Sequence, residues 1–210
     1  MFNDFNSITE STPAAIIEAA NRLFSANGYH GTSMRQIAQE AGIAVAGIYN
    51  HFSSKEEIFI TVLEVHHPYN DVIPALRAAQ GESLAEFVRD AAQKMITSLD
   101  RQPGFLNLMF IELVEFDAQH VPLLFEKFFP EVRLVLERFA QGQSELRSIP
   151  IPVLIRAFFG LFFSYFITGQ LLGPRLPVEM QENAFDYFVD IYLHGILGNP
   201  PKKFVNKEAC

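Results

Sequence analysis

Apolar residues recur at intervals of three and four along most of the chain. The first run of this kind contains Ile16, Ile17, Ala20, Leu23 and Phe24. Such spacing places the apolar side chains on one face of an α-helix. No segment alternates apolar and polar residues over the length of a β-strand. The pattern therefore predicts an all-α fold.

Prolines, glycines and short polar stretches divide this pattern into about nine expected helices. Their expected ranges are 13–27, 33–41, 44–50, 54–67, 83–101, 105–117, 122–141, 152–172 and 177–197. Two of them begin with a serine followed three residues later by Gln or Glu: Ser33 with Gln36, and Ser53 with Glu56. This is the spacing of a capping box. We expect both serines to cap helix N-termini.

Short helices come first along the chain and long helices follow. We therefore expect two domains, a three-helix head at residues 1–52 and a larger helical body at residues 53–210. The helix that starts near residue 54 would join them. A head of this size can be a binding module, and the long apolar helices of the body can enclose a core of their own.

The segment at residues 31–52 has the spacing of a helix-turn-helix. Ala38 lies four residues before Gly42, and Ile48 lies six residues after it. Two helices that cross steeply need a small residue at the crossing, which Ala38 supplies. Gly42 allows a turn with positive φ, and Ile48 can anchor the second helix inward. The same spacing also fits two packed helices of an ordinary bundle.

The residues that follow favour the helix-turn-helix interpretation. Tyr49, Asn50 and His51 end the second helix, and Lys55 starts the next one. These side chains pack a core poorly and are well suited to phosphates and base edges. Two alternatives stay open, since Tyr49 could pack inside and His51 could simply cap the helix.

Together these positions resemble the N-terminal domain of the TetR family of bacterial transcriptional regulators. The residues that carry the resemblance are Thr32, Ile37-Ala38, Ala41-Gly42-Ile43, Ile48-Tyr49, His51-Phe52 and Lys55. The resemblance is close from Pro13 to about Phe59. Beyond it, the chain agrees with the family in length, in helical character and in a loose pattern at residues 142–147.

The resemblance implies a cytoplasmic, non-enzymatic regulator, most often a repressor. Such a protein binds a palindromic double-stranded operator as a homodimer and is released by a small apolar or amphipathic effector. Carried over by position, the phosphate contacts are Thr32, Tyr49, His51 and Lys55, and the base-facing positions are Val45, Gly47 and Asn50. Independently, the free amides at the start of the second expected helix favour an anion near Thr32 and Ser33.

The chain departs from the family at the recognition helix. Ala44 stands where the family commonly has a serine that caps this helix, and the lost cap costs about 1 kcal/mol. Gly47 offers no side chain to a base. Direct readout is therefore expected from Val45 and Asn50, with Tyr49 as a further candidate.

Phenylalanines are concentrated in the expected body, and two groups of them suggest sites. The expected effector pocket contains Phe87, Met95, Phe105, Met109, Phe110, Glu112, Phe116, Phe125 and Phe128. Core packing is the alternative for each apolar member, and Glu112 is expected to be exposed. The expected dimer interface contains Phe158, Phe162, Tyr165, Phe166, Phe185, Phe188 and Tyr192. These residues make their helices apolar on several faces, which a second subunit can cover.

Composition excludes several other functions. The single cysteine, Cys210, leaves no internal disulfide and no cysteine-based zinc site. One Glu-x-x-His pair, Glu64 with His67, is too little for a di-metal site, and no Gly-x-Ser-x-Gly motif occurs. The apolar run at residues 157–172 is shorter than a membrane span needs. We expect no cofactor, no metal and no membrane partner.

Charge alone argues against a nucleic-acid partner. The net charge is −8, and residues 1–67 carry three basic and seven acidic side chains. DNA-binding domains usually show a basic surface. The motif outweighs this argument, because a few placed donors and helix N-termini can hold phosphates. The alternative is a helical small-molecule-binding protein or enzyme whose head no longer binds DNA.

Overall fold

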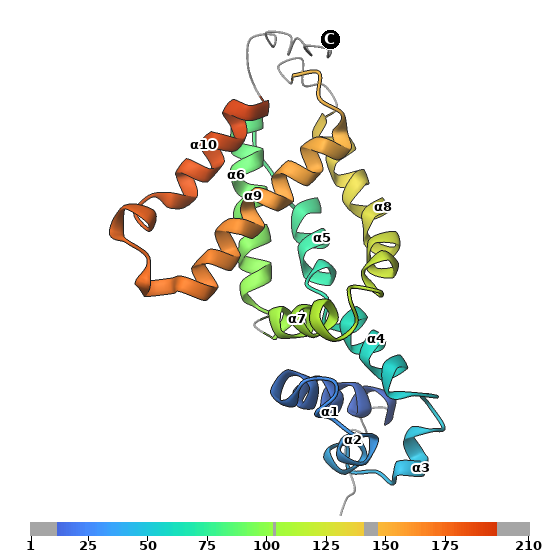
Figure 1. The fold of residues 1–210 in the computed structure, drawn as a ribbon. Coiled ribbons are helices and arrows are strands. Elements are labelled where there is room, and N and C mark those ends of the chain that lie inside the picture. Colours follow the sequence, from blue (N-terminus) through green and yellow to red (C-terminus); the bar gives the residue numbers. More distant parts are fainter. Residues whose placement is uncertain (1–11, 103, 141–146, 197–210) are drawn as a thin grey trace, which may run out of the picture. The chain divides into compact units, whose positions relative to one another are not determined.

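The computed structural model describes residues 12–102, 104–140 and 147–196. These residues form ten α-helices and two short 3-10 helices and contain no strand, so the expected all-α fold is confirmed. Figure 1 shows their order along the chain. Cys210 and the pattern at residues 142–147 lie at or beyond the edges of the described residues.

The chain divides into two compact units. Unit 1 comprises residues 1–67 and 102–126, and unit 2 comprises residues 68–101 and 127–210. Unit 1 therefore holds the expected head and, in addition, residues 53–67 and 102–126. The expected functional division at residue 52 is a different boundary and stays a prediction.

Unit 1 is built on the helices α1 (Thr12–Asn27), α2 (Met34–Glu40), α3 (Val45–Ile48), α4 (Lys55–Val65) and α7 (Phe105–Glu115). Helix α1 packs on α2, α4 and α7. Phe24 and Phe59 are fully buried at the centre of this core, with their rings edge to face at 5.4 Å. Leu108 and Ile111 of α7 belong to the same core, so α7 is a structural part of unit 1.

The turn between α2 and α3 has the expected geometry. Gly42 has a φ of 70°, a conformation that costs glycine little. Ala38 and Ile48 are buried, as the helix-turn-helix spacing requires. The Ile43 amide donates to the Ala38 carbonyl at 3.0 Å, which holds the turn against the end of α2.

The two expected capping boxes have different outcomes. At α2, the Ser33 hydroxyl accepts from the Gln36 amide and Gln36 accepts from the Ser33 amide, so this prediction is confirmed. At α4, the prediction of Ser53 with Glu56 is wrong. Ser54 is the cap, and it accepts from the Glu57 amide, while the Glu57 carboxylate accepts from the amide and hydroxyl of Ser53.

Unit 2 contains α5 (Tyr69–Arg77), α6 (Leu84–Asp100), α9 (Ile151–Leu172) and α10 (Ala184–Ile196), two 3-10 helices, η1 (Gly173–Arg175) and η2 (Val178–Met180), and most of α8 (Val121–Ala140). Helix α6 packs on α5, α9 and α10, and α9 packs on α10. Two expectations need correction. The short helix α5 was not expected, because Pro68 precedes it and Pro74 lies inside it. The single helix expected at 177–197 is instead η2 followed by α10.

Helix α9 is long and apolar enough to cross a membrane by length and composition. It is also longer than the apolar run expected at residues 157–172. Phe158, Phe162 and Phe166 are buried within unit 2, whereas the opposite side of the helix is exposed. Arg156 and Gln170 lie on exposed positions, and the Gln170 amide donates to Asp100 at 2.9 Å. Arg156 and Gln170 therefore place polar groups on the exposed side of α9.

Candidate DNA-binding site

The N-terminus of α2 presents an exposed polar end. Ser33 is the cap, and the first turn continues with Met34 and Arg35. Ser33 and Arg35 are both exposed. A helix start combines free amides with a favourable dipole for anions, and Arg35 adds a positive charge beside it. Arg35 is not among the DNA contacts expected from the sequence, although its position in the first turn of α2 is a signal that could have identified it.

Thr32 lies just before this cap and is buried. Its side chain is 2% exposed, and its hydroxyl donates to the carbonyls of Leu23 and Gly28 at 3.2 and 2.9 Å. The single hydroxyl hydrogen of a threonine is thereby used inside unit 1. This geometry favours a structural role for Thr32 over the implied phosphate contact.

Lys55 starts α4 and reaches back to the turn between α1 and α2. Its Nζ donates to the carbonyls of Tyr29 and Thr32, both at 2.7 Å, and lies 4.0 Å from the centre of the Tyr29 ring. Burial lowers the pKa of Lys55, and the nearby Glu115 carboxylate opposes this shift. An ammonium has three donors, so one stays available beyond the two carbonyls.

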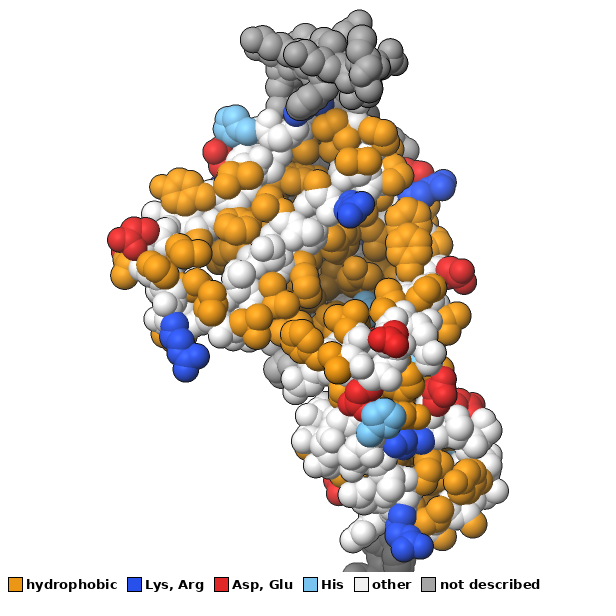
Figure 2. All heavy atoms as spheres, viewed as in Figure 1, with side chains coloured by type: hydrophobic (Ala, Val, Ile, Leu, Met, Phe, Trp, Pro, Cys, Tyr) orange, Lys and Arg blue, Asp and Glu red, His pale blue; other side chains and the backbone are white. Residues whose placement is uncertain are grey.

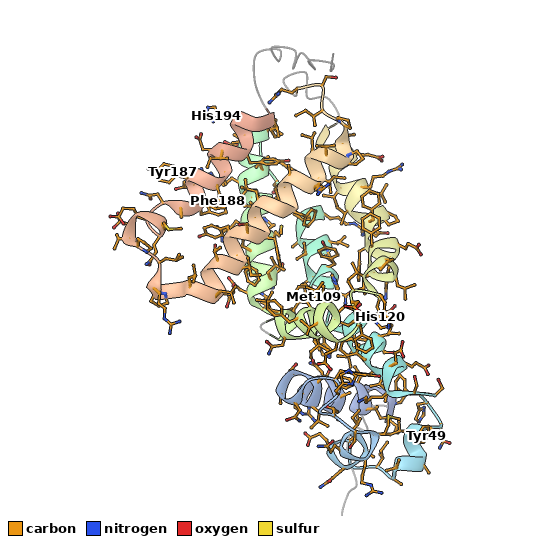
Figure 3. All side chains as sticks on the ribbon, in the orientation of Figure 1. Tyr49, Met109, His120, Tyr187, Phe188 and His194 are labelled. Atoms are coloured by element: carbon orange, nitrogen blue, oxygen red, sulfur yellow. The ribbon has the colours of Figure 1, made fainter. Side chains whose placement is uncertain are left out.

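Helix α3 is short, and three exposed candidate residues follow its last residue, Ile48. Tyr49 is 57% exposed, and Asn50 and His51 are exposed beside it, while Ile48 behind them is fully buried. Figure 3 shows Tyr49 at the outer side of α3. The alternative of a Tyr49 packed in the core is therefore excluded. Val45 and Gly47 are half-buried, and Ala44 makes no side-chain cap bond at the start of the helix.

Two residues outside the sequence-based set hold this site together. Glu115 of α7 accepts from the backbone amides of Tyr29 and His30 at 3.1 and 2.8 Å. Tyr29 packs its ring against Phe59 and Phe116, at 5.5 and 4.5 Å between centres. Burial and the charges of Glu56 and Glu115 raise the pKa of Tyr29. No local pattern links residues 29 and 115, so only the fold reveals this contact.

Comparison with known proteins agrees with this geometry. The family model for bacterial regulatory proteins of the tetR family matches residues 16–62. This range contains α2, α3 and the turn between them. Residues 16–62 therefore belong to the tetR family of bacterial regulatory proteins. Members of this family are DNA-binding regulators and not enzymes.

Curated relatives match the N-terminal part of this TetR-family chain. The transcriptional activator FasR of Mycolicibacterium smegmatis is 30% identical over 111 residues, which are 53% of this chain and 44% of the relative. The regulator HbdR of Aromatoleum sp. is 40% identical over 68 residues, which are 32% of this chain and 30% of the relative. The matched part thus spans less than half the length of these relatives.

A solved structure matches the fold over nearly the whole chain. The fatty acid degradation regulator FadR of Bacillus halodurans superimposes with a TM-score of 0.68 and 17% identity, covering 90% of this chain and 98% of the other. At this identity the likeness shows the fold alone. It extends the TetR-like architecture beyond the head.

The structure distributes the expected effector-pocket residues of the TetR-family chain over both units. Unit 1 holds Phe105, Met109, Phe110, Glu112, Phe116 and Phe125, and unit 2 holds Phe87, Met95 and Phe128. Phe110 and Phe125 are exposed, and Met95 and Phe128 are buried in the core. A common pocket for the whole set stays a prediction.

Glu112 corrects an expectation, because it is fully buried instead of exposed. Its carboxylate accepts from the backbone amide of His120 at 2.7 Å and pairs with His120 Nδ1 at 2.8 Å. Both oxygens are therefore occupied within unit 1. His120 is the partner of the Glu112 carboxylate within the same unit, so Glu112 does not need a cationic ligand.

Unit 2 contains one small enclosed apolar cavity among its described residues. Its lining is Leu76, Phe87, Val88, Ala91, Val135, Phe158, Phe159 and Tyr192. Its volume is about 10 Å³, which is room for about one water molecule. This volume is too small for an organic molecule, so an effector could bind here only if side chains moved. The described residues contain no group of three or more His, Cys, Asp or Glu that could hold a metal.

Several expected dimer residues are instead part of the core of unit 2. Phe158, Phe162, Phe166 and Tyr192 are buried within one subunit, which favours core packing over an interface and leaves their assignment to the interface a prediction. Their rings pack on each other, as in the pairs Phe158–Phe162 at 4.9 Å and Phe158–Tyr192 at 5.5 Å. Tyr165, Phe185 and Phe188 are half-buried between α9 and α10.

The exposed apolar residues of these helices lie on other positions. They are Val153, Leu171 and Leu172 on α9, and Tyr187 and Ile191 on α10. Figure 2 shows hydrophobic side chains along both helices, and Figure 3 shows Tyr187 directed away from α9 while Phe188 is directed toward it. This exposed apolar surface is what a second subunit could cover.

Proposed function

We propose that this TetR-family regulator is a cytoplasmic, effector-responsive repressor that binds a palindromic operator as a homodimer. The observation that carries the proposal is the exposed end of α3, where Tyr49, Asn50 and His51 project beside the buried anchor Ile48. An exposed aromatic ring and amide at the end of a recognition helix suit a major groove. The exposed start of α2, with Ser33 and Arg35, suits the phosphate backbone.

Base readout is proposed to rest on few side chains. Asn50 can bond an adenine edge, and Val45 can contact a thymine methyl group. Gly47 has no side chain, so its proposed role is to let the backbone of α3 come close to the DNA. Tyr49, His51 and Lys55 are proposed phosphate contacts, and Lys55 combines this role with its two internal hydrogen bonds.

The charge of the chain predicts how strongly its affinity for DNA depends on salt concentration. Arg35 and Lys55 supply the positive charges of the proposed site, whereas residues 1–67 carry seven acidic side chains. The logarithm of DNA affinity falls with the logarithm of salt by about 0.9 per phosphate contact. We expect a shallow slope for this class of protein and weak non-specific binding, so that operator affinity depends on dimerisation and fit.

The homodimer is proposed to form through the exposed faces of α9 and α10. Tyr187 is 62% exposed and Ile191 is 60% exposed, although both are apolar. Two copies of these helices can form a four-helix bundle around a two-fold axis. A two-fold protein then matches a palindromic operator, with one head on each half-site.

The effector is proposed to be small and apolar or amphipathic. The lining of the cavity in unit 2 is apolar apart from the hydroxyl of Tyr192, which donates to the Leu154 carbonyl. A ligand that wedges between these side chains would have to rearrange the packing of α9 on α6. Any such ligand shifts DNA binding only by its different affinity for the two arrangements.

A DNA-binding experiment tests the core of the proposal. Fluorescence anisotropy would be measured with duplexes that tile the DNA next to the gene of this chain. Asn50→Ala should weaken binding to the selected duplex by roughly tenfold or more, because one bidentate base contact contributes about 1–3 kcal/mol. Asn107→Ala is the matched control, since Asn107 is exposed on α7. Equal losses for both variants, or no binding by the wild-type protein, would refute the site.

Transcription in vitro tests the direction of regulation. A repressor lowers the yield from a promoter that contains the selected duplex, and an added effector restores it. Increased yield would instead make the protein an activator, as FasR is named. The same reaction, supplemented with long-chain or aromatic carboxylic acids, screens for effector chemistry.

A further inference from the structure

The turn between α1 and α2 is held by two helices at once. Residues 28–32 form this turn, and Ser33, the cap of α2, follows directly. From α4, Lys55 binds the carbonyls of Tyr29 and Thr32. From α7, Glu115 binds the amides of Tyr29 and His30. The backbone donors and the backbone acceptors of the turn thus have separate charged partners.

The Glu115 contact is bidentate and sheltered. Oε1 accepts from Tyr29 and Oε2 accepts from His30, while His30 Nε2 lies 3.7 Å from Oε2. The Glu115 side chain is mostly buried, with 19% exposed. Two consecutive amides that converge on one carboxylate form an anion-binding turn. Charge-assisted hydrogen bonds of this kind are stronger than neutral ones.

Gly28 leaves the space in which this carboxylate sits. A β-carbon at residue 28 would lie 2.9 Å from Glu115 Oε1, which is closer than such contacts occur. Gly28 also has a φ of 75°, which glycine adopts at little cost. The turn is therefore shaped around the carboxylate as well as bonded to it.

The helix that supplies Glu115 is firmly attached to the head at the same point. The Phe116 ring stacks on Phe59 of α4 at 4.8 Å with an angle of 15° between planes. The same ring meets Tyr29 and His120 edge to face. Helix α7 lies in the segment at residues 102–126, which is joined along the chain to unit 2 at both of its ends.

We infer that Glu115 is a positioning residue for DNA binding, which sets the start of α2 by holding the amides of Tyr29 and His30. The inference rests on the proposed function. Withdrawal of the carboxylate leaves two amides unpaired, and Lys55 remains as the charged partner of the turn that leads into Ser33. The start of α2 then loses its fixed place against a phosphate, although Glu115 itself does not touch DNA.

Glu115→Gln tests the inference with little change of shape. The amide group keeps one acceptor oxygen and loses the charge, so one backbone amide loses its partner. We expect the affinity for the selected duplex to fall by roughly tenfold, the effect of one lost charge-assisted hydrogen bond. The salt slope should become shallower by about 1 per head, because the phosphate contact at α2 is lost.

Asp117→Asn is the matched control. Asp117 is exposed two residues further on, has a φ of 51° that asparagine tolerates, and its substitution removes the same charge. Affinity and salt slope should match the wild-type values. Binding is measured well below the unfolding temperature of each variant, which circular dichroism provides. A purely stabilising Glu115 would change that temperature and leave both DNA readouts unchanged, which would overturn the inference.

Gly28→Ala reaches the same contact from the other side. The added methyl group displaces the carboxylate while the charge of Glu115 is kept. Weaker duplex binding together with shifted amide resonances of Tyr29 and His30 supports the inference, and wild-type affinity with those shifts overturns it. If the wild-type protein binds none of the duplexes, the proposed function fails first, and unshifted amides in Glu115→Gln would independently refute the clamp.

Discussion

The buried carboxylate of Glu112 holds His120 through two separate groups, its backbone amide at 2.7 Å and its ring Nδ1 at 2.8 Å. A carboxylate only accepts hydrogen bonds, so Nδ1 carries the hydrogen. Glu112 is fully buried and the His120 side chain is 7% exposed. This pair closes the turn after α7, where Asp117 and Ala118 have positive φ.

Glu112→Gln should therefore destabilise the protein strongly. The new amide group keeps only one acceptor oxygen, so the variant either leaves the Nδ1–H of His120 unpaired or forces the ring into its other tautomer, and the two hydrogen bonds to a buried carboxylate are lost. We expect the free energy of unfolding to fall by about 2–4 kcal/mol, as when one partner of a buried pair is changed. Urea unfolding monitored by circular dichroism measures this loss.

Glu126→Gln controls for the loss of one negative charge, because Glu126 is exposed on α8. It should change the unfolding free energy by less than about 0.5 kcal/mol. A Glu112→Gln variant as stable as this control would show that the buried carboxylate is not needed for the turn.

The local parts of the fold and site could be predicted from the sequence. Ser33 with Gln36 and Gly42 with Ile48 act within a few residues, so their spacing carries the information. At α4 the sequence pattern predicts the cap one residue too early, at Ser53 instead of Ser54. Two serines precede two glutamates there, and the pairs Ser53–Glu56 and Ser54–Glu57 have the same spacing.

The long-range parts could not be predicted in the same way. Helix α9 is apolar on every side, so no periodicity distinguishes the core residue Phe162 from the exposed Val153. Glu112 and Glu115 lie in an apolar run, and only the fold shows which partner each carboxylate meets. Lys55 was assigned from the family resemblance, which did not indicate its bonds to the Tyr29 and Thr32 carbonyls.

Ala44→Ser should stabilise the head. Ala44 is the cap residue of α3, with extended backbone angles of −71° and 147°, and it makes no side-chain cap bond. A serine hydroxyl at this position can accept from a free amide in the first turn. The expected gain is about 1 kcal/mol in the free energy of unfolding.

Ala46→Ser separates capping from a general effect of serine. Ala46 is exposed within α3, where serine has a lower helix propensity than alanine. The unfolding temperature of Ala44→Ser should be higher than that of the wild-type protein, and that of Ala46→Ser should be equal to it or lower. The opposite order would mean that the start of α3 is already satisfied in another way.

Ile191→Glu tests the proposed dimer face. Ile191 is exposed on α10, and a glutamate there would be buried near its own copy if two subunits meet across a two-fold axis. The dimer should weaken by roughly 100-fold or more, since an unpaired buried charge costs several kcal/mol. Sedimentation at micromolar concentration measures the change.

Leu134→Glu is the corresponding control on α8, where Leu134 is similarly exposed. It should remain as dimeric as the wild-type protein. A monomeric wild-type protein would refute the proposed homodimer, and equal dissociation of the two variants would place its interface elsewhere.

The hydroxyl of Tyr192 stabilises the folded protein, and this contribution should be lost at alkaline pH. Its hydroxyl donates to the Leu154 carbonyl at 3.2 Å, and burial raises its pKa above the ordinary value of 10. The neutral form is thus favoured in the folded state. Its contribution is fully present below the unfolded pKa and is lost as pH rises through the folded pKa.

Tyr192→Phe isolates this contribution. Near neutral pH the variant should be less stable by about 0.5–1.5 kcal/mol, because the hydrogen bond to Leu154 is lost. Between about pH 8 and pH 11 the wild-type protein should lose about 1.4 kcal/mol more than the variant, since its unfolded chain gains an ionised tyrosine that the folded chain lacks. Urea unfolding at both pH values measures the two differences.

Tyr187→Phe controls for the removal of a hydroxyl, because Tyr187 is exposed on the same helix. Its stability should follow the wild-type protein at both pH values. If Tyr192→Phe also follows the wild-type protein from neutral to alkaline pH, the hydroxyl of Tyr192 is ionised as readily in the folded chain as in the unfolded one. The packing of α10 on α9 would then have to admit water to the Leu154 carbonyl.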